Sequence, residues 1–204
     1  MSDADPPAPA TPRDAASLLV IRGAGDAVEV LMGLRGAGHR FMPMRLVFPG
    51  GAVDPTDATA PHASPLRAAT RRLLERAATP ELAGALGIAA ARELAEETGL
   101  HLGHPPSLAP LDYLCRAVTP PSSPIRFNAR FLVVDAAHVG GELAGSGEIE
   151  DVRYYRVDEA LALDLAWITR GVLDRLRIYL AMDGAARDAR TALPVCQSRN
   201  WTEE

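Results

Sequence analysis

The sequence predicts an α+β fold arranged as an α/β/α sandwich. Strand-like stretches precede and follow one central helix-like stretch, and a second long helix-like stretch lies near the C-terminus. The central helix is expected over residues 80–98, because Gly99 provides a stop at its C-terminal end. The final helix is expected over residues 167–182, where apolar residues recur at helical spacing. We find no internal repeat, so residues 15–182 are expected to form a single domain.

The shorter elements are predicted from turn residues that bound apolar or alternating runs. A turn at residues 23–26 joins the first two strands into a hairpin. A helix is expected over residues 64–78, with Ser64 as its N-cap and Pro65 in its first turn. A short helix is expected over residues 158–163. The predicted strands are residues 15–22, 28–35, 44–48, 112–118, 126–134 and 151–157.

The two ends of the chain lack such patterns. Residues 1–14 are rich in proline and alanine and are expected to form a disordered leader. Residues 183–204 show weak periodicity and are expected to form a C-terminal tail. The leader lacks a basic start followed by an apolar core, so we expect no secretory signal. No apolar run approaches the ~20 residues needed to cross a bilayer.

Composition narrows the class of protein. A chain of 204 residues with 48% hydrophobic and 23% charged residues is typical of a soluble globular protein with a substantial core. The net charge of −5 argues against a broad nucleic-acid-binding surface, although it leaves a small nucleotide substrate open. Cys115 and Cys196 are the only cysteines and form no C-x-x-C pair, so neither a zinc site nor a disulfide is expected. This usage fits a reducing cytoplasm.

The central helix carries a cluster of carboxylates. At about 100° per residue, Glu93, Glu96 and Glu97 fall within about 100° of arc. Like charges at this spacing repel each other by about 0.2–0.5 kcal/mol per pair, and Arg92 offsets part of that repulsion. A hard divalent cation would turn the repulsion into binding, because Mg²⁺ takes oxygen ligands. The alternative is a solvated helix face, since glutamate is common on exposed helices.

The surroundings of the cluster favour a site. The strand that ends near residue 48 leads to Gly50 and Gly51, and two glycines permit a close approach of backbone to a ligand. The nine residues 92–100, Arg-Glu-Leu-Ala-Glu-Glu-Thr-Gly-Leu, follow. Together these segments resemble the box of the Nudix hydrolases, whose second half is met at every fixed position. The resemblance implies a mixed β-sheet between helices.

The first half of the box departs from the family pattern. Gly51 is in place, but Asp57 stands where the family has glutamate. Between Asp57 and Arg92 lie 34 residues, where the family usually has about seven, so residues 58–87 are interpreted as an insertion. We expect this insertion to fold outside the sheet and to be peripheral to the chemistry. Its arginines indicate a solvated helix, with a phosphate-binding lid as the alternative.

The resemblance implies metal-dependent hydrolysis of a diphosphate linkage. The expected cofactor is Mg²⁺ or Mn²⁺, with Glu93, Glu96 and Glu97 as ligands, the same three that the helical arc selects. Glu96 and Glu97 carry most of the catalytic weight, and Arg92 orients a carboxylate by ion pairing. The general base is left open between a box glutamate and an acidic residue of a later loop, for which Glu148 is our candidate.

The expected partner is a small diphosphate substrate, with no nucleic acid and no membrane, and a homodimer is left open. Candidate substrate contacts are Arg35, Arg45, Gly50, Gly51 and Arg126, because guanidinium groups pair with phosphate. The stretch before the split box is similar to the Nudix branch that includes peroxisomal coenzyme A diphosphatases, which implies CoA or acyl-CoA as substrate. A nucleotide sugar, ADP-ribose, a dinucleotide and a non-catalytic ligand sensor remain as alternatives.

Overall fold

The structure is a computed structural model that describes residues 10–36, 44–145 and 147–204, and the statements below refer to these residues. Its helices are α1 (Ala68–Leu74), α2 (Pro80–Thr98), α3 (Val157–Ala162), α4 (Trp167–Leu180) and α5 (Gly184–Asp188). Three short 3₁₀ turns are η1 (Gly25–Ala27), η2 (Pro55–Ala58) and η3 (Ala136–His138). The strands are β1 (Arg13–Arg22), β2 (Glu29–Arg35), β3 (Leu46–Val47), β4 (Gly50–Ala52), β5 (Leu100–His101), β6 (Asp112–Val118), β7 (Phe127–Asp135), β8 (Gly140–Gly141), β9 (Ile149–Arg156), β10 (Pro194–Gln197) and β11 (Asn200–Glu203).

The main sheet is mixed and has the order β11-β10-β6-β7-β1-β2-β3, with β4 also paired to β1 and β9 to β2. Strand β1 runs parallel to β7 along nearly its whole length, and β10 runs parallel to β6. The other pairs of the main sheet are antiparallel. Strands β5 and β8 form a separate small sheet. The expected mixed sheet is therefore confirmed.

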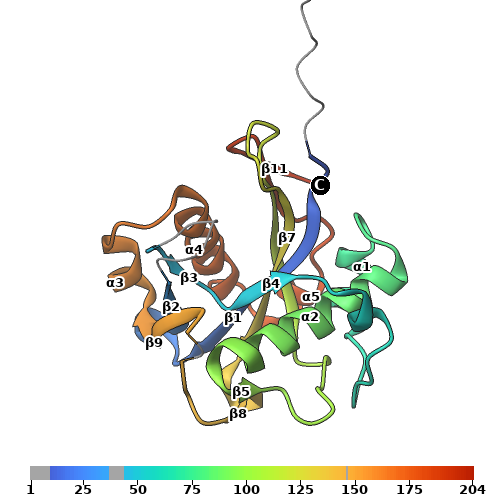
Figure 1. The fold of residues 1–204 in the computed structure, drawn as a ribbon, viewed down its shortest axis with the longest axis horizontal. Coiled ribbons are helices and arrows are strands. Elements are labelled where there is room, and N and C mark those ends of the chain that lie inside the picture. The colour runs from blue at the N-terminus through green and yellow to red at the C-terminus, as the bar shows by residue number, and fades with distance from the viewer. Residues whose placement is uncertain (1–9, 37–43, 146) are drawn as a thin grey trace, which may run out of the picture.

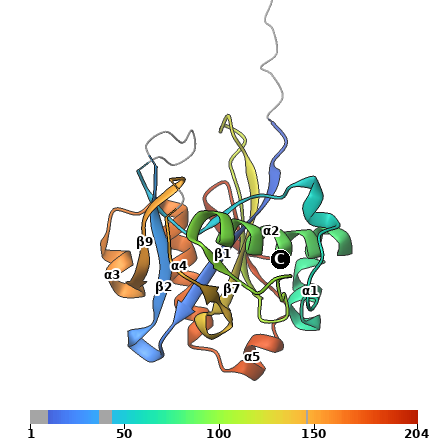
Figure 2. The same cartoon turned by 60° about the horizontal axis from the view of Figure 1, so that its bottom comes forward.

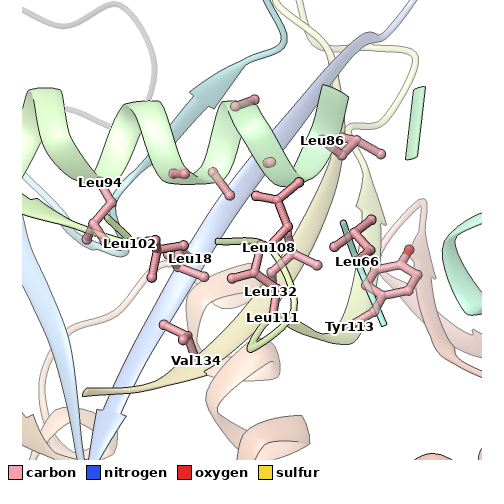
Figure 3. Close-up of a cluster of buried hydrophobic side chains, with 14 of the residues drawn as sticks. Leu18, Leu66, Leu86, Leu94, Leu102, Leu108, Leu111, Tyr113, Leu132 and Val134 are labelled. Carbon is pink, nitrogen blue, oxygen red and sulfur yellow. The ribbon is translucent and has the colours of Figure 1, made fainter. Parts of the chain in front are cut away.

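Helices cover both faces of this sheet, as the predicted α/β/α sandwich requires (Figure 1). Strand β1 shows the division, because its side chains alternate between two cores. Leu18 and Val20 pack in the core beneath α2, whereas Leu19 and Ile21 pack in the core beneath α4. Figure 3 shows Leu94 of α2 pointing toward the buried side chains that include Leu18 of β1.

Helix α2 begins and ends where the sequence predicts. Thr79 caps it by accepting a hydrogen bond from the Leu82 N–H at 3.2 Å, and Pro80 fills the first position. Gly99 ends it with a φ of 72°, a left-handed conformation that favours glycine. This helix presents the carboxylate cluster to β4, which is joined to β1.

The insertion folds outside the sheet, with α1 beside α2 (Figures 1 and 2), and it also packs into the core. That it is peripheral to the chemistry stays a prediction. Leu66, Leu73 and Leu74 are buried in the core beneath α2, and the Thr70 hydroxyl donates to the Leu111 carbonyl at 2.8 Å. The interval 58–87 also includes the first two turns of α2.

The start of the insertion helix was predicted wrongly. Helix α1 begins at Ala68 after Arg67, with no side-chain cap, rather than at the Ser64-Pro65 pair. Ser64 is instead 2.6 Å from Ser107, hydroxyl to hydroxyl, and its backbone forms a bridge with the same residue. A tertiary contact therefore uses the residue that local propensity assigns to the cap.

Both predicted tails also differ from the structure. Residues 1–9 of the expected leader lie outside the described residues, but Arg13 and Asp14 already belong to β1. The expected tail 183–204 contains α5, β10 and β11, so it contributes two strands to the main sheet. Among the described residues, no helix combines the length and apolar character needed to cross a membrane.

Candidate active site

The centre of the candidate site is the contact between Glu97 of α2 and Gly50 of β4. The Gly50 N–H donates to Oε2 of Glu97 at 2.8 Å, and Glu97 is only 3% exposed. A Cβ atom on Gly50 would lie 2.5 Å from the Ala16 carbonyl oxygen, so the close packing of β4 on β1 requires glycine there. Burial raises the pKa of Glu97 to about 8, although the Gly50 hydrogen bond opposes the shift.

Glu93 lies against the second glycine in the same way. A Cβ atom on Gly51 would lie 2.3 Å from Oε1 of Glu93, so a larger residue there would displace this carboxylate. Burial also raises the pKa of Glu93, whereas its hydrogen bond and ion pair with Arg92 lower it. The two glycines expected near the site thus lie directly beside two of the three expected carboxylates.

Arg92 connects the box residues. Its Nε and Nη2 donate to the two carboxylate oxygens of Asp57, both at 3.0 Å, and Nη2 also donates to the Ala52 carbonyl at 3.0 Å. Its Nη1 donates to Glu93 at 2.7 Å and to Glu96 at 3.0 Å. One guanidinium therefore offsets part of the repulsion among the box carboxylates, and the Asp57 contact is the main cause that raises the pKa of Arg92.

Asp57 is held as a rigid partner for this arginine. It is 3% exposed, and its Oδ2 accepts a hydrogen bond from the Asp54 N–H at 2.7 Å in a reciprocal cap of η2. The carboxylate of Asp57 is therefore available to Arg92 in a fixed orientation, although the side chain is one methylene shorter than the glutamate of the family pattern.

The three glutamates do not converge on one point in this structure. Glu93 and Glu96 turn toward Arg92, while Glu97 turns toward the Gly50 N–H. Among the described residues, no three His, Cys, Asp or Glu side chains are arranged to hold a metal ion. The donor chemistry nevertheless fits a hard cation, because all three are carboxylates and Glu97 is buried without a cationic hydrogen-bond partner.

Glu148, the candidate general base, precedes β9 and lies close enough for its charge to act on the site. Its charge raises the pKa of both Glu93 and Glu97. Its side chain is exposed, and its carbonyl accepts a hydrogen bond from the Gly36 N–H at 3.1 Å, which fixes its backbone beside the end of β2.

A cavity of about 870 Å³ lies on the α4 side of the sheet and reaches Gly50, the hydrogen-bond partner of Glu97, although no glutamate of α2 is among the residues that line it. Gly50 and Gly51 form part of its wall, so at these two positions β4 presents only backbone to the cavity. The rest of the wall is mainly apolar and aromatic. Its larger side chains are Val47, Phe48, Phe127, Phe131, Trp167 and Ile168.

Arg35 is the predicted phosphate contact that the structure brings to this cavity. It lines the wall, and its charge lowers the pKa of Glu97. Its Nε atom is buried with no hydrogen-bond partner among the described residues, which is unusual for a buried donor. An anionic oxygen in the cavity would satisfy it.

The structure does not bring Arg45 or Arg126 to the cavity. Arg45 pairs with the Asp164 carboxylate and also donates to the Asp164 carbonyl at 3.2 Å. Arg126 donates to the carbonyls of Thr119 at 3.1 Å and Ala10 at 2.6 Å. Neither is among the lining residues, so these two sequence candidates are occupied with structural contacts.

Sequence reasoning missed much of the cavity wall. The loop 119–123 and the turn residues Ser198 and Arg199 line it, yet the turn falls in the expected tail. The short apolar run of residues 193–196, followed by four polar residues and Trp201, is the signal that could have revealed the hairpin.

Comparison with known proteins agrees with this geometry. Residues 83–176 match the model of the NUDIX domain family. The NUDIX hydrolase of Alicyclobacillus acidocaldarius is 27% identical, with a TM-score of 0.64 over 84% of this chain and 96% of that one. The comparison with curated proteins gives no significant match.

Two more distant structures share the fold. The MutT NUDIX hydrolase of Burkholderia pseudomallei has a TM-score of 0.54 at 19% identity, over 82% of this chain and 99% of that one. The NUDIX domain of Shewanella oneidensis NrtR, solved with ADP ribose, has a TM-score of 0.56 at 16% identity, over 88% and 95%. The chain thus has the Nudix fold, and the match to the NUDIX domain family spans residues 83–176 of it. The domain match and the similarity to the Alicyclobacillus acidocaldarius hydrolase support a hydrolase of the Nudix type.

Proposed function

We propose that this protein is a metal-dependent hydrolase that cleaves the diphosphate linkage of a nucleoside diphosphate derivative. The observation that carries the proposal is the buried Glu97 carboxylate, held by the Gly50 N–H beside a cavity large enough for a nucleotide-sized ligand. A carboxylate with a raised pKa next to a ligand-sized cavity is typical of a functional site.

We assign the cation, Mg²⁺ or Mn²⁺, to Glu93, Glu96 and Glu97. When bound, it supplies charge neutralisation at the phosphates and lowers the pKa of a water molecule. Rotation of Glu93 and Glu96 away from Arg92 would free their oxygens, and Arg92 would keep its two hydrogen bonds to Asp57. Arg92 therefore acts as a positioning residue.

The remaining roles follow from position. Arg35 binds a phosphate oxygen of the scissile diphosphate, which satisfies its buried Nε. Gly50 and Gly51 give the diphosphate access to the carboxylates. Glu148 takes the proton from the attacking water, because its charge already acts on both Glu93 and Glu97.

For the substrate, we propose CoA or acyl-CoA. The support is the sequence similarity of the stretch before the split box, together with an apolar cavity wall that suits a nucleobase or an aliphatic chain. A nucleotide sugar, a dinucleotide or ADP-ribose is the alternative, and the NrtR domain with its ADP ribose shows that a neighbour of this fold binds such a ligand.

A non-catalytic ligand sensor is the second candidate function. One observation favours it: the three glutamates that would bind a cation already accept hydrogen bonds from Arg92 and from the Gly50 N–H. A sensor would bind the nucleotide in the same cavity and leave it intact.

One panel separates these functions. CoA, ADP-ribose, NADH and diadenosine polyphosphates are incubated with Mg²⁺ or Mn²⁺, and products are resolved by chromatography. Hydrolysis of CoA above the others supports the proposal, and preferred hydrolysis of another compound selects the alternative substrate. Tight binding without turnover of any compound, in either metal, refutes the enzyme and selects the sensor.

A further inference from the structure

The turn between β10 and β11 has an unusual conformation. Gln197 pairs with Asn200, so Ser198 and Arg199 form a two-residue hairpin loop. Both have positive φ, 49° and 64°, and this conformation at both central residues is normally filled by Asn-Gly pairs. Here the two positions are a serine and an arginine instead, and both line the cavity.

The hairpin is fixed in place by its neighbours. A Cβ atom on Gly171 of α4 would lie 2.9 Å from the Trp201 ring, so the indole packs directly on the helix backbone. Arg175 lies over the same ring, 4.4 Å from its centroid. Leu193 and Glu204 exchange two backbone hydrogen bonds of 3.0 Å at the other end of the hairpin. The turn therefore holds Arg199 in a defined place.

The charged residues of the cavity wall all carry positive charge. Arg35 and Arg199 are its two basic residues, and none of the described residues that line it is acidic. In the described part of the chain, Arg199 has no hydrogen bond or ion pair with a carboxylate, unlike Arg116 on the neighbouring strand, which pairs with Glu204. An exposed guanidinium at the mouth of an apolar cavity is suited to an anionic ligand group.

The two arginines lie at separate places along the cavity. Arg35 ends β2, and Arg199 follows β10, and the strands β1, β7 and β6 lie between them in the sheet. At about 4.8 Å per strand, these strands separate the two backbones by on the order of 19 Å, and β4, which pairs with β1 at residues 15–17, adds to the separation near Arg35. Two extended arginine side chains span part of this separation. The distance that remains between the two guanidinium groups is comparable with the distance between two phosphate groups at different positions of one nucleotide.

We infer that Arg199 binds a phosphate group on the organic part of the substrate, away from the scissile diphosphate. The protein would then prefer nucleoside diphosphate derivatives with an additional phosphate on the nucleoside. The inference rests on the proposed function, because it takes the cavity to hold the substrate with its diphosphate near Arg35 and Glu97.

The kinetic test compares coenzyme A with 3′-dephospho-coenzyme A, which differ only in that phosphate. Arg199→Gln should lower kcat/KM for coenzyme A about 10- to 100-fold, mainly through KM, and should change that for the dephosphorylated compound less than two-fold. Arg71→Gln, at an exposed arginine of α1 outside the cavity wall, is the matched control and should change neither. Equal losses for both compounds, or no loss, would overturn the inference.

A second variant separates the loss of the guanidinium from misfolding of the turn. Arg199→Gly suits the left-handed conformation better than arginine does, so its Tm should equal or exceed that of the wild type. Its discrimination between the two coenzymes should still be lost. Retained discrimination in this variant would show that the hairpin backbone, rather than the guanidinium, recognises the phosphate, and would contradict the inference.

A binding measurement keeps this inference separate from the proposed hydrolysis. Adenosine 3′,5′-bisphosphate and AMP are titrated against the full chain by calorimetry, with no turnover required. We expect at least ten-fold tighter binding of the bisphosphate, and loss of that preference in Arg199→Gln. This preference without any hydrolysis would refute the proposed function and support the Arg199 site, whereas equal affinities in the wild type would refute the site.

Discussion

Replacement of Glu97 by glutamine should stabilise the cation-free protein and remove most of its activity. Glutamine keeps the size of the side chain. It also keeps an oxygen that can accept the hydrogen bond of the Gly50 N–H, which in the wild type lies 2.8 Å from Oε2 of Glu97. It cannot ionise, so it cannot supply the anionic ligand that the proposed mechanism needs. The two effects have opposite signs, and a merely structural carboxylate would not produce both.

The size of the stabilisation follows from the pKa of Glu97. Burial raises this pKa from 4.5 to about 8, so the folded protein holds a proton that the unfolded chain has lost. Between these two pH values the native state binds more protons, and stability from this group falls as the pH rises. The full difference corresponds to up to ~5 kcal/mol, reached above pH 8.

The assay is urea denaturation of the wild type and Glu97→Gln between pH 5 and 8.5 in EDTA. We expect the wild type to lose on the order of 3 kcal/mol relative to the variant over this range. Added Mg²⁺ should restore the wild type alone, because binding to the native state stabilises it. Parallel pH profiles for the two proteins would refute the reasoning, as would a variant with activity within a few-fold of the wild type.

Three further changes test the supports of the site. Arg92→Ala should lower kcat at least 100-fold and destabilise the fold by about 3–5 kcal/mol, because it leaves the buried Asp57 unpaired; unchanged urea midpoints would contradict this. Leu73→Ala should cost about 2–5 kcal/mol, because the insertion packs in the core; a loss below ~1 kcal/mol in thermal denaturation would show that α1 is peripheral after all. Asp112→Asn should cost about 3 kcal/mol, since Asp112 is buried and paired with Arg190 at 2.9 Å; wild-type stability would mean that this pair contributes nothing.

The parts of the fold that the sequence predicts are those set by local signals. Helix α2 was placed to the residue because Pro80 and Gly99 determine its two ends whatever the helix packs against. Gly50 and Gly51 were placed beside the carboxylates because they resemble the glycines that open a known box, although an insertion lengthens the stretch between them and the helix. These elements contain the residues of the candidate site that lie on α2 and β4.

The parts that escaped prediction depend on contacts between distant segments. Strand β10 has four residues, and its place in the sheet comes from pairing with β6, about eighty residues earlier in the chain. The capping signal of Ser64 is overridden by its contact with Ser107. Likewise, Arg45 looked like a phosphate ligand because Asp164, its partner, is remote in sequence. Local propensity carries no information on such pairs.

The central claim is hydrolysis of a diphosphate by a metal-activated water, and its most direct test is turnover of coenzyme A in ¹⁸O-water with and without a chelator. With Mg²⁺ or Mn²⁺, the label should enter one phosphate product of each cleavage. Excess EDTA should stop the reaction, and returning the metal should restore it. Full turnover in EDTA, or products that contain no label, would contradict the account.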